Sequence, residues 1–168
     1  MMRLSRSLLP LLMIATGAVA LGGCQTTAPI AHGLSARQIA VLKQQGFVET
    51  ARGWAFSVDD RLLFATDDSA IDAGQATKIT RMASALLGVG IGRARIEGYA
   101  DSTGTEQYNE TLSLHRAQAV ADVLVGSGFA ATNLTVLGLG DRDPVESNRT
   151  AAGRSQNRRV VILISATD

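Results

Sequence analysis

The chain has 168 residues, of which 46% are hydrophobic and 18% are charged, and its formal net charge is +1. This length and composition fit one globular domain with a tail. The single cysteine excludes an intrachain disulfide, and the nearly neutral charge gives no electrostatic reason to expect nucleic-acid binding.

The first residues have the features of a bacterial lipoprotein signal peptide. Arg3 and Arg6 precede an apolar run over residues 8–21, which is too short to cross a hydrocarbon core of about 30 Å comfortably. Residues 21–24 resemble a lipobox, which implies removal of residues 1–23 and lipidation of Cys24. The alternative is ordinary secretory cleavage, which would leave Cys24 as a free thiol. Either cleavage removes two of the 16 basic residues and leaves a formal charge of −1.

Residues 24–33 are small and mostly polar, which predicts a flexible tether. Residues 34–58 follow as a short helix and a β-hairpin. Ser35 is a typical N-cap for a helix through Gln45, after which a glycine is typical of a helix end. Two strands joined by a tight turn then complete the hairpin.

The hairpin holds three of the seven aromatic residues of the chain, namely Phe47, Trp54 and Phe56. Such clustering predicts either a wall of the hydrophobic core or an exposed surface that binds another protein. Leu42 lies on the apolar side of the preceding helix. Leu42, Phe47, Trp54 and Phe56 are therefore candidate partner-binding residues, and the alternative that they only complete the core remains open.

The rest of the chain shows the pattern of an α+β domain. Apolar residues at three- and four-residue spacing predict a helix over 72–87, and a second long helix is predicted over 105–125. Strands are predicted over 93–99, which alternates like a half-buried strand, over 134–139, and over 160–164, whose uniformly apolar side chains are typical of a central strand. These elements predict a mixed β-sheet with both long helices packed on one face, preceded by the short helix and hairpin.

Polar residues of this domain are placed to form one site. Asp101 follows a predicted strand, and Asn109 and Arg116 lie two turns apart on one face of the next helix, with Leu112 between them. Arg158 precedes the last strand. A fixed carboxylate and a guanidinium that forms two parallel hydrogen bonds with a carboxylate could together bind a zwitterion.

Several motifs recur along this part of the chain in a fixed order. They are GYAD (98–101), YN (108–109), LS (112–113), RA (116–117) and NRRV (157–160). The set resembles the signature of the OmpA-like (Pal-like) peptidoglycan-binding domain, which would here occupy residues 59–168. The resemblance implies an OmpA-like fold and non-covalent binding of peptidoglycan through the diaminopimelate of its stem peptide.

The resemblance also implies a role for each matching residue. Asp101 would contact the ammonium group of diaminopimelate and Arg116 its carboxylate, with Asn109 and Arg158 in support. The alternative for Asp101 and Arg116 is an ordinary surface ion pair, which contributes about 0–1 kcal/mol.

Two further candidate site residues depart from the family pattern. Ala100 stands where the family has a threonine, and Asp67 where it has an asparagine. Ala100 lacks a hydroxyl that could bond the ligand, and Asp67 adds a negative charge near an anionic polymer. Both changes bear on affinity.

The sequence gives no sign of catalytic chemistry. No nucleophile with a neighbouring base, no paired catalytic carboxylates and no metal-ligand spacing stand out, and His32 and His115 are far apart. We therefore expect no enzyme activity, no cofactor and no metal site.

Residues 34–47 and 53–56 carry a finer resemblance, to outer-membrane lipoproteins of a cyclic-di-GMP signalling system. In that system the lipoprotein sequesters a YfiR-like periplasmic inhibitor and so activates a diguanylate cyclase. This implies a signalling protein that is lipid-anchored in the outer membrane and faces the periplasm. The alternative is a Pal-type structural tether between outer membrane and cell wall. The sequence leaves a homodimer open in both cases.

Overall fold

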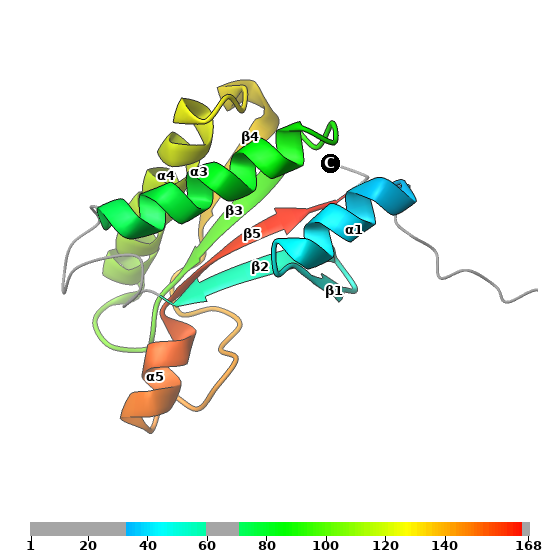
Figure 1. Cartoon of the computed structure of the whole chain (residues 1–168). Helices are drawn as coiled ribbons and strands as arrows, with labels where there is room; N and C mark the ends of the chain where they lie inside the picture. The colour runs from blue at the N-terminus through cyan, green and yellow to red at the C-terminus, as the bar shows by residue number, and fades with distance from the viewer. Residues whose placement is uncertain (1–32, 60–70, 166–168) are drawn as a thin grey trace, which may run out of the picture.

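The structure is a computed structural model that describes residues 33–59 and 71–165 (Figure 1). Its strands are β1 (Val48–Thr50), β2 (Gly53–Asp59), β3 (Ala94–Tyr99), β4 (Leu134–Gly138) and β5 (Arg159–Ile164). They form one sheet in the order β1-β2-β5-β3-β4. β3 and β4 are parallel, and the other neighbouring pairs are antiparallel. The sheet is therefore mixed, and the prediction that the last strand is central is confirmed.

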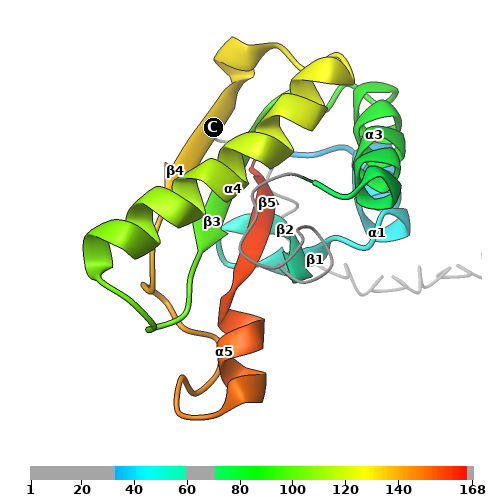
Figure 2. The same cartoon turned by 90° about the vertical axis from the view of Figure 1, so that its left-hand side faces the viewer.

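Three helices cover one face of the sheet (Figures 1 and 2). They are α1 (Ala36–Gln44), α3 (Ala73–Leu87) and α4 (Glu106–Gly126). Leu86 of α3 and Leu124 of α4 belong to one buried cluster with Ile96 and Ile162 of the sheet. The predicted α+β fold, with both long helices on one face, is confirmed.

The local sequence explains where the helices begin. The Ser35 hydroxyl accepts a hydrogen bond from the backbone N–H of Gln38, whose side chain bonds back to Ser35 in a capping box. Asp72 and Thr105 cap α3 and α4 by accepting bonds from first-turn N–H groups. Each predicted end of these three helices lies within one residue of the observed end.

Two short helices are not predicted by the sequence pattern. They are η1 (Ala131–Asn133) and α5 (Ala151–Asn157). The sequence of α5, AAGRSQN, has no large apolar side chain and hence no helical periodicity. Figure 1 shows α5 at the start of β5, outside the layer formed by the other helices.

The N-terminal helix and hairpin extend the domain and are not separate from it. β2 pairs with β5 from Trp54 opposite Ile164 to Asp59 opposite Arg159, so the predicted boundary between residues 58 and 59 falls inside a strand. Leu42 of α1 lies in the same buried cluster as the residues of α3 and α4.

The prediction that β3 is half-buried is wrong. Ala94 and Ile96 face the helices and are buried as expected. On the opposite face of the sheet, however, Glu97 and Tyr99 are also buried, with only 1% and 2% of their surface exposed. The physical reason is a set of polar contacts on that face, described with the site below.

Candidate functional site

The position of α4 over the sheet depends on two glycines. Gly98 of β3 and Gly138 of β4 lie opposite each other in the parallel pair. A Cβ atom on Gly98 would overlap the backbone carbonyl of Ser113, and one on Gly138 would lie 2.5 Å from the carbonyl oxygen of Glu110. Only glycine therefore allows α4 to lie so close to the carboxyl ends of β3 and β4.

Asp101 lies just beyond β3, where its carboxylate is held by two donors. Its Oδ1 atom accepts a hydrogen bond of 2.8 Å from the backbone N–H of Thr103, and its Oδ2 atom accepts one of 2.5 Å from Nη1 of Arg158. Burial acts to raise the pKa of Asp101, but the bonds from Thr103 and Arg158 outweigh it and lower that pKa below the ordinary 3.8. Asp101 is therefore an anion at neutral pH, although only 7% of its surface is exposed.

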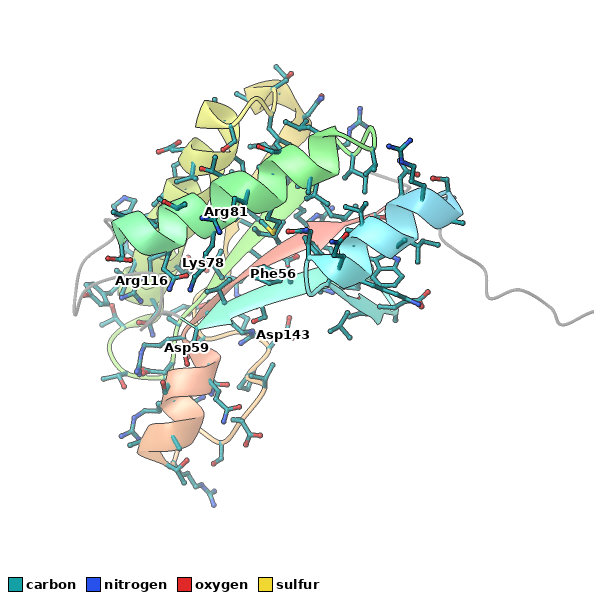
Figure 3. All side chains as sticks on the ribbon, viewed as in Figure 1. Phe56, Asp59, Lys78, Arg81, Arg116 and Asp143 are labelled. Carbon is teal, nitrogen blue, oxygen red and sulfur yellow. The ribbon has the colours of Figure 1, made fainter. Side chains whose placement is uncertain are left out.

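Asn109 and Arg116 project from α4 toward the same end of β3. The Asn109 side-chain amide donates a hydrogen bond of 3.0 Å to the backbone carbonyl of Asp101. Asn109 and Arg116 are buried, with 3% and 4% exposed, and Leu112 between them is half-buried. Figure 3 shows Arg116 below the first turn of α3. The structure thus places Asn109 and Arg116 on one buried helix face, as their seven-residue spacing suggested, and it places Arg158 against Asp101.

The remaining candidates divide into described and undescribed residues. Ala100 is buried, and its backbone N–H donates a hydrogen bond of 2.7 Å to the carbonyl of Gly140. Asp67, Cys24, the predicted signal peptide and the predicted tether up to residue 32 lie outside the described residues.

Sequence reasoning missed the role of Asn157. This fully buried residue accepts hydrogen bonds of 2.9 Å from the backbone N–H groups of Val145 and Glu146. Its amide donates to Asn148, whose side-chain oxygen accepts a bond of 3.3 Å from the backbone of Ser102. Asn157 therefore ties the loop after β4 to the loop that carries Asp101. Its place in the NRRV motif was the available signal.

Sequence reasoning also missed a polar network on the sheet face opposite the helices. The Glu97 carboxylate accepts hydrogen bonds of 2.8 Å from Nη1 of Arg52 and from the Tyr99 hydroxyl. The Arg159 guanidinium stacks over the Tyr99 ring at 3.8 Å. Burial, followed by the bond to Glu97, raises the pKa of Tyr99, which keeps its hydroxyl protonated as a donor. The network joins the β1–β2 turn to β3.

The four candidate partner-binding residues differ in how far they are buried. Leu42, Phe47 and Trp54 are buried in the core, so a partner cannot touch them in this conformation. Phe56 is partly exposed, and its ring centroid lies 5.4 Å from that of Phe47. The alternative that these residues complete the core therefore describes three of the four.

Two absences apply to residues 33–59 and 71–165. No helix there is long and apolar enough to cross a membrane. The same residues contain no group of three or more histidine, cysteine or carboxylate side chains that could hold a metal ion.

Similar proteins exist for nearly the whole chain. It is 43% identical over 164 residues to the outer-membrane lipoprotein YfiB of Pseudomonas aeruginosa, covering 98% of this chain and 97% of that protein. It is 40% identical over 129 residues to the putative lipoprotein YfiB of Escherichia coli, covering 76% of this chain and 81% of that protein. We conclude that the chain is an outer-membrane lipoprotein that faces the periplasm.

A solved structure and a family profile also match this chain. The cell wall anchor of the T6SS from Pseudomonas aeruginosa matches with a TM-score of 0.64 and 30% identity, over 77% of this chain and 94% of that one. The OmpA family profile matches residues 63–158, which is more than half of the chain. The chain therefore belongs to the OmpA family.

Proposed function

We propose that this lipoprotein binds peptidoglycan non-covalently, without catalysis, through the diaminopimelate of its stem peptide. The observation that carries the proposal is the burial of Asp101 and Arg116 where β3 ends against α4. Asp101 would bind the ammonium group and Arg116 the carboxylate. This burial favours a ligand site over an exposed ion pair, because charges shielded from water interact more strongly with a ligand.

Asp101 has capacity left for a ligand. A carboxylate offers about four lone-pair positions, and Asp101 uses its two oxygens for Thr103 and Arg158. An ammonium group could therefore share the carboxylate with Arg158. Arg158 would add positive charge close to the ligand carboxylate and so assist Arg116.

Sedimentation with purified sacculi tests this proposal. We expect Arg116→Ala to weaken binding about ten- to hundredfold, because a charge-assisted hydrogen bond contributes roughly 1.5–3 kcal/mol. His115→Ala is the matched control, since His115 is the exposed neighbour on the same helix and should bind like the wild type. Equal pelleting of Arg116→Ala and wild type would remove Arg116 from the site.

We further propose that Cys24 carries the lipid anchor. Cys24→Ser should abolish palmitate labelling and release the protein from the outer-membrane fraction, while sacculus binding is retained. Labelling of the variant at the wild-type level would contradict this assignment.

We also propose that the protein sequesters a YfiR-like periplasmic inhibitor and thereby activates a diguanylate cyclase. Two observations support this: the similarity to YfiB over almost the whole chain, and the partly exposed Phe56 beside α1. The alternative remains a Pal-type structural tether, which needs no such partner.

Capture of the purified YfiR-like protein by the immobilised lipoprotein separates these alternatives. Phe56→Ser should reduce capture and lower cellular cyclic-di-GMP while sacculus binding is unchanged. Leu114→Ser is the control, because Leu114 is an exposed apolar residue on α4, away from the groove. If wild type binds sacculi but captures no inhibitor, the structural tether is the correct account.

A further inference from the structure

A groove lies between β2, α3 and Gln45, the residue that caps the C-terminal end of α1. Its volume is about 260 Å³. Phe56 and Val58 of β2 and Ile79 and Met82 of α3 give it an apolar lining, and glutamines complete it. All four apolar residues stand on the helical side of the sheet, away from the Glu97 network. The groove therefore offers an apolar side chain from another molecule a place to be buried.

Two cations flank this apolar lining. Lys78 and Arg81 lie one turn apart on α3, line the groove and are exposed. Figure 3 shows both on the side of α3 that faces Phe56. Neither side chain makes an ion pair or a hydrogen bond with the described part of the chain. Their charges are thus available to an incoming group.

The helix that lines the groove, α3, and the neighbouring α1 carry charge of one sign. Within their ranges, α1 and α3 contain two basic residues each and no aspartate or glutamate, although the chain without residues 1–23 is slightly acidic. Asp72 precedes α3, but its carboxylate is occupied in capping that helix. Asp59 follows Val58 but lines a different cavity with Arg159, on the opposite face of the sheet. The groove therefore complements an acidic surface.

We propose that this groove is where the periplasmic inhibitor docks, with an apolar side chain on Phe56 and Met82 and with carboxylates on Lys78 and Arg81. This inference rests on the proposed signalling function and specifies the chemistry of its partner. Burial of the apolar side chain supplies affinity. The two cations steer the acidic partner and fix its orientation, so they act mainly on the association rate.

Association kinetics of the purified YfiR-like protein with the immobilised full-length lipoprotein test the inference. Lys78→Glu and Arg81→Glu should each lower the association rate about three- to tenfold at low salt, and the difference should shrink near 0.5 M salt. Arg37→Glu is the matched control. It makes the same charge change at an exposed position of α1 that does not line the groove, and it should change the rate less than twofold. If the acidic residue of the inhibitor that contacts Lys78 is replaced by lysine, the inhibitor should again bind the Lys78→Glu lipoprotein.

The outcomes separate the inference from the proposed function. If wild type captures no inhibitor, the proposed function fails and the inference fails with it. If Phe56→Ser reduces capture while Lys78→Glu and Arg81→Glu behave like Arg37→Glu, the inhibitor binds without using the groove cations, and only the inference is overturned. A change in self-association of the lipoprotein, with inhibitor binding unchanged, would show that a second copy occupies the groove and would also overturn it.

Discussion

The two proposed binding surfaces differ in how their charged groups are held. At the end of β3, the carboxylate of Asp101 accepts bonds from Thr103 and Arg158, and Asn109 bonds to its backbone. In the groove between β2 and α3, Lys78 and Arg81 extend into solvent beside an apolar lining. The first surface is preorganised for one small ligand geometry, because its side chains lose little freedom on binding. The exposed cations of the second would lose side-chain freedom when a partner covers them, which suits a regulated protein contact.

The comparison also separates the elements on which each surface depends. The proposed peptidoglycan-binding site at the end of β3 needs the close approach of α4 to β3 and β4, which two glycines permit. α1 packs into the core through Leu42 next to the groove, and we expect this packing to hold the partner surface in check. Damage to one set of contacts should therefore leave the other surface functional, unless the whole core is lost.

The largest effect is expected for Gly98→Ala, because its Cβ would overlap the carbonyl of Ser113. Overpacking costs about 1–3 kcal/mol and more against rigid backbone, so we expect at least about 3 kcal/mol of lost stability. Chemical denaturation measures this, and wall binding should fall as well. Gly126→Ala is the control, because a Cβ there meets nothing within 4 Å, and it should be neutral or slightly stabilising. A Gly98→Ala protein as stable as wild type would mean that α4 does not need this contact.

A smaller and more local effect is expected for Leu42→Pro. Proline in a helix interior costs about 3 kcal/mol, and here it would unwind α1. Cellular cyclic-di-GMP should rise without the stimulus, because loosening α1 changes the partner surface, while sacculus pelleting stays within twofold of wild type. Leu42→Ala keeps the helix and removes only core packing. Comparing cyclic-di-GMP in the two variants therefore shows whether unwinding of α1 or loss of packing causes the rise. Joint loss of wall binding and partner capture would mean that α1 is only part of the fold.

A still smaller effect is expected in the polar network on the sheet face opposite the helices. Glu97→Ala leaves the buried Tyr99 hydroxyl without its acceptor, which should cost about 1–3 kcal/mol of unfolding free energy. Arg52→Ala should cost less than about 1 kcal/mol, because the Arg52 side chain is 55% exposed and its ion pair is weakened by solvent. Thermal and chemical denaturation measure both variants. If Glu97→Ala and Arg52→Ala lost the same unfolding free energy, the role given to Tyr99 would be contradicted.

The smallest effect near neutral pH is expected from titration of Asp101. Because its folded-state pKa is lowered below 3.8, the carboxylate is ionised above that pH. Its contribution to folding and to ammonium binding is therefore fully present above about pH 5 and is lost as the pH falls through the lowered pKa. Stem-peptide binding should be flat from pH 5 to pH 8 and fall below pH 3.8, and Asp101→Asn should lack this acid limb. An acid limb of the same size in the variant would assign it to another group.

The sequence predicts the fold where local signals and the tertiary structure agree. The cap Ser35 and the apolar stripe of α3 predict helix ends, and the apolar run of β5 predicts its central position. α5 has no such periodicity and is missed.

The parts that sequence cannot predict are long-range pairs of polar residues. Glu97 is buried because Arg52, 45 residues earlier, covers it, and no local pattern carries that information. Asp101 and Arg158 are 57 residues apart, and they could be placed together only from the expected sheet topology and the family motif. The helical periodicity also does not predict a binding role for Lys78 and Arg81, because charged residues at these positions are typical of any solvent-exposed helix face.

The central claim is that Arg116 recognises the free carboxylate of diaminopimelate. Calorimetric titration of wild type and Arg116→Ala with a diaminopimelate stem peptide, and with the same peptide amidated at that carboxylate, tests it as a double-mutant cycle. We expect amidation to weaken binding to wild type about ten- to hundredfold. Arg116→Ala should bind both peptides equally weakly, because the interaction is already lost. An equal loss on amidation in both proteins would contradict the account.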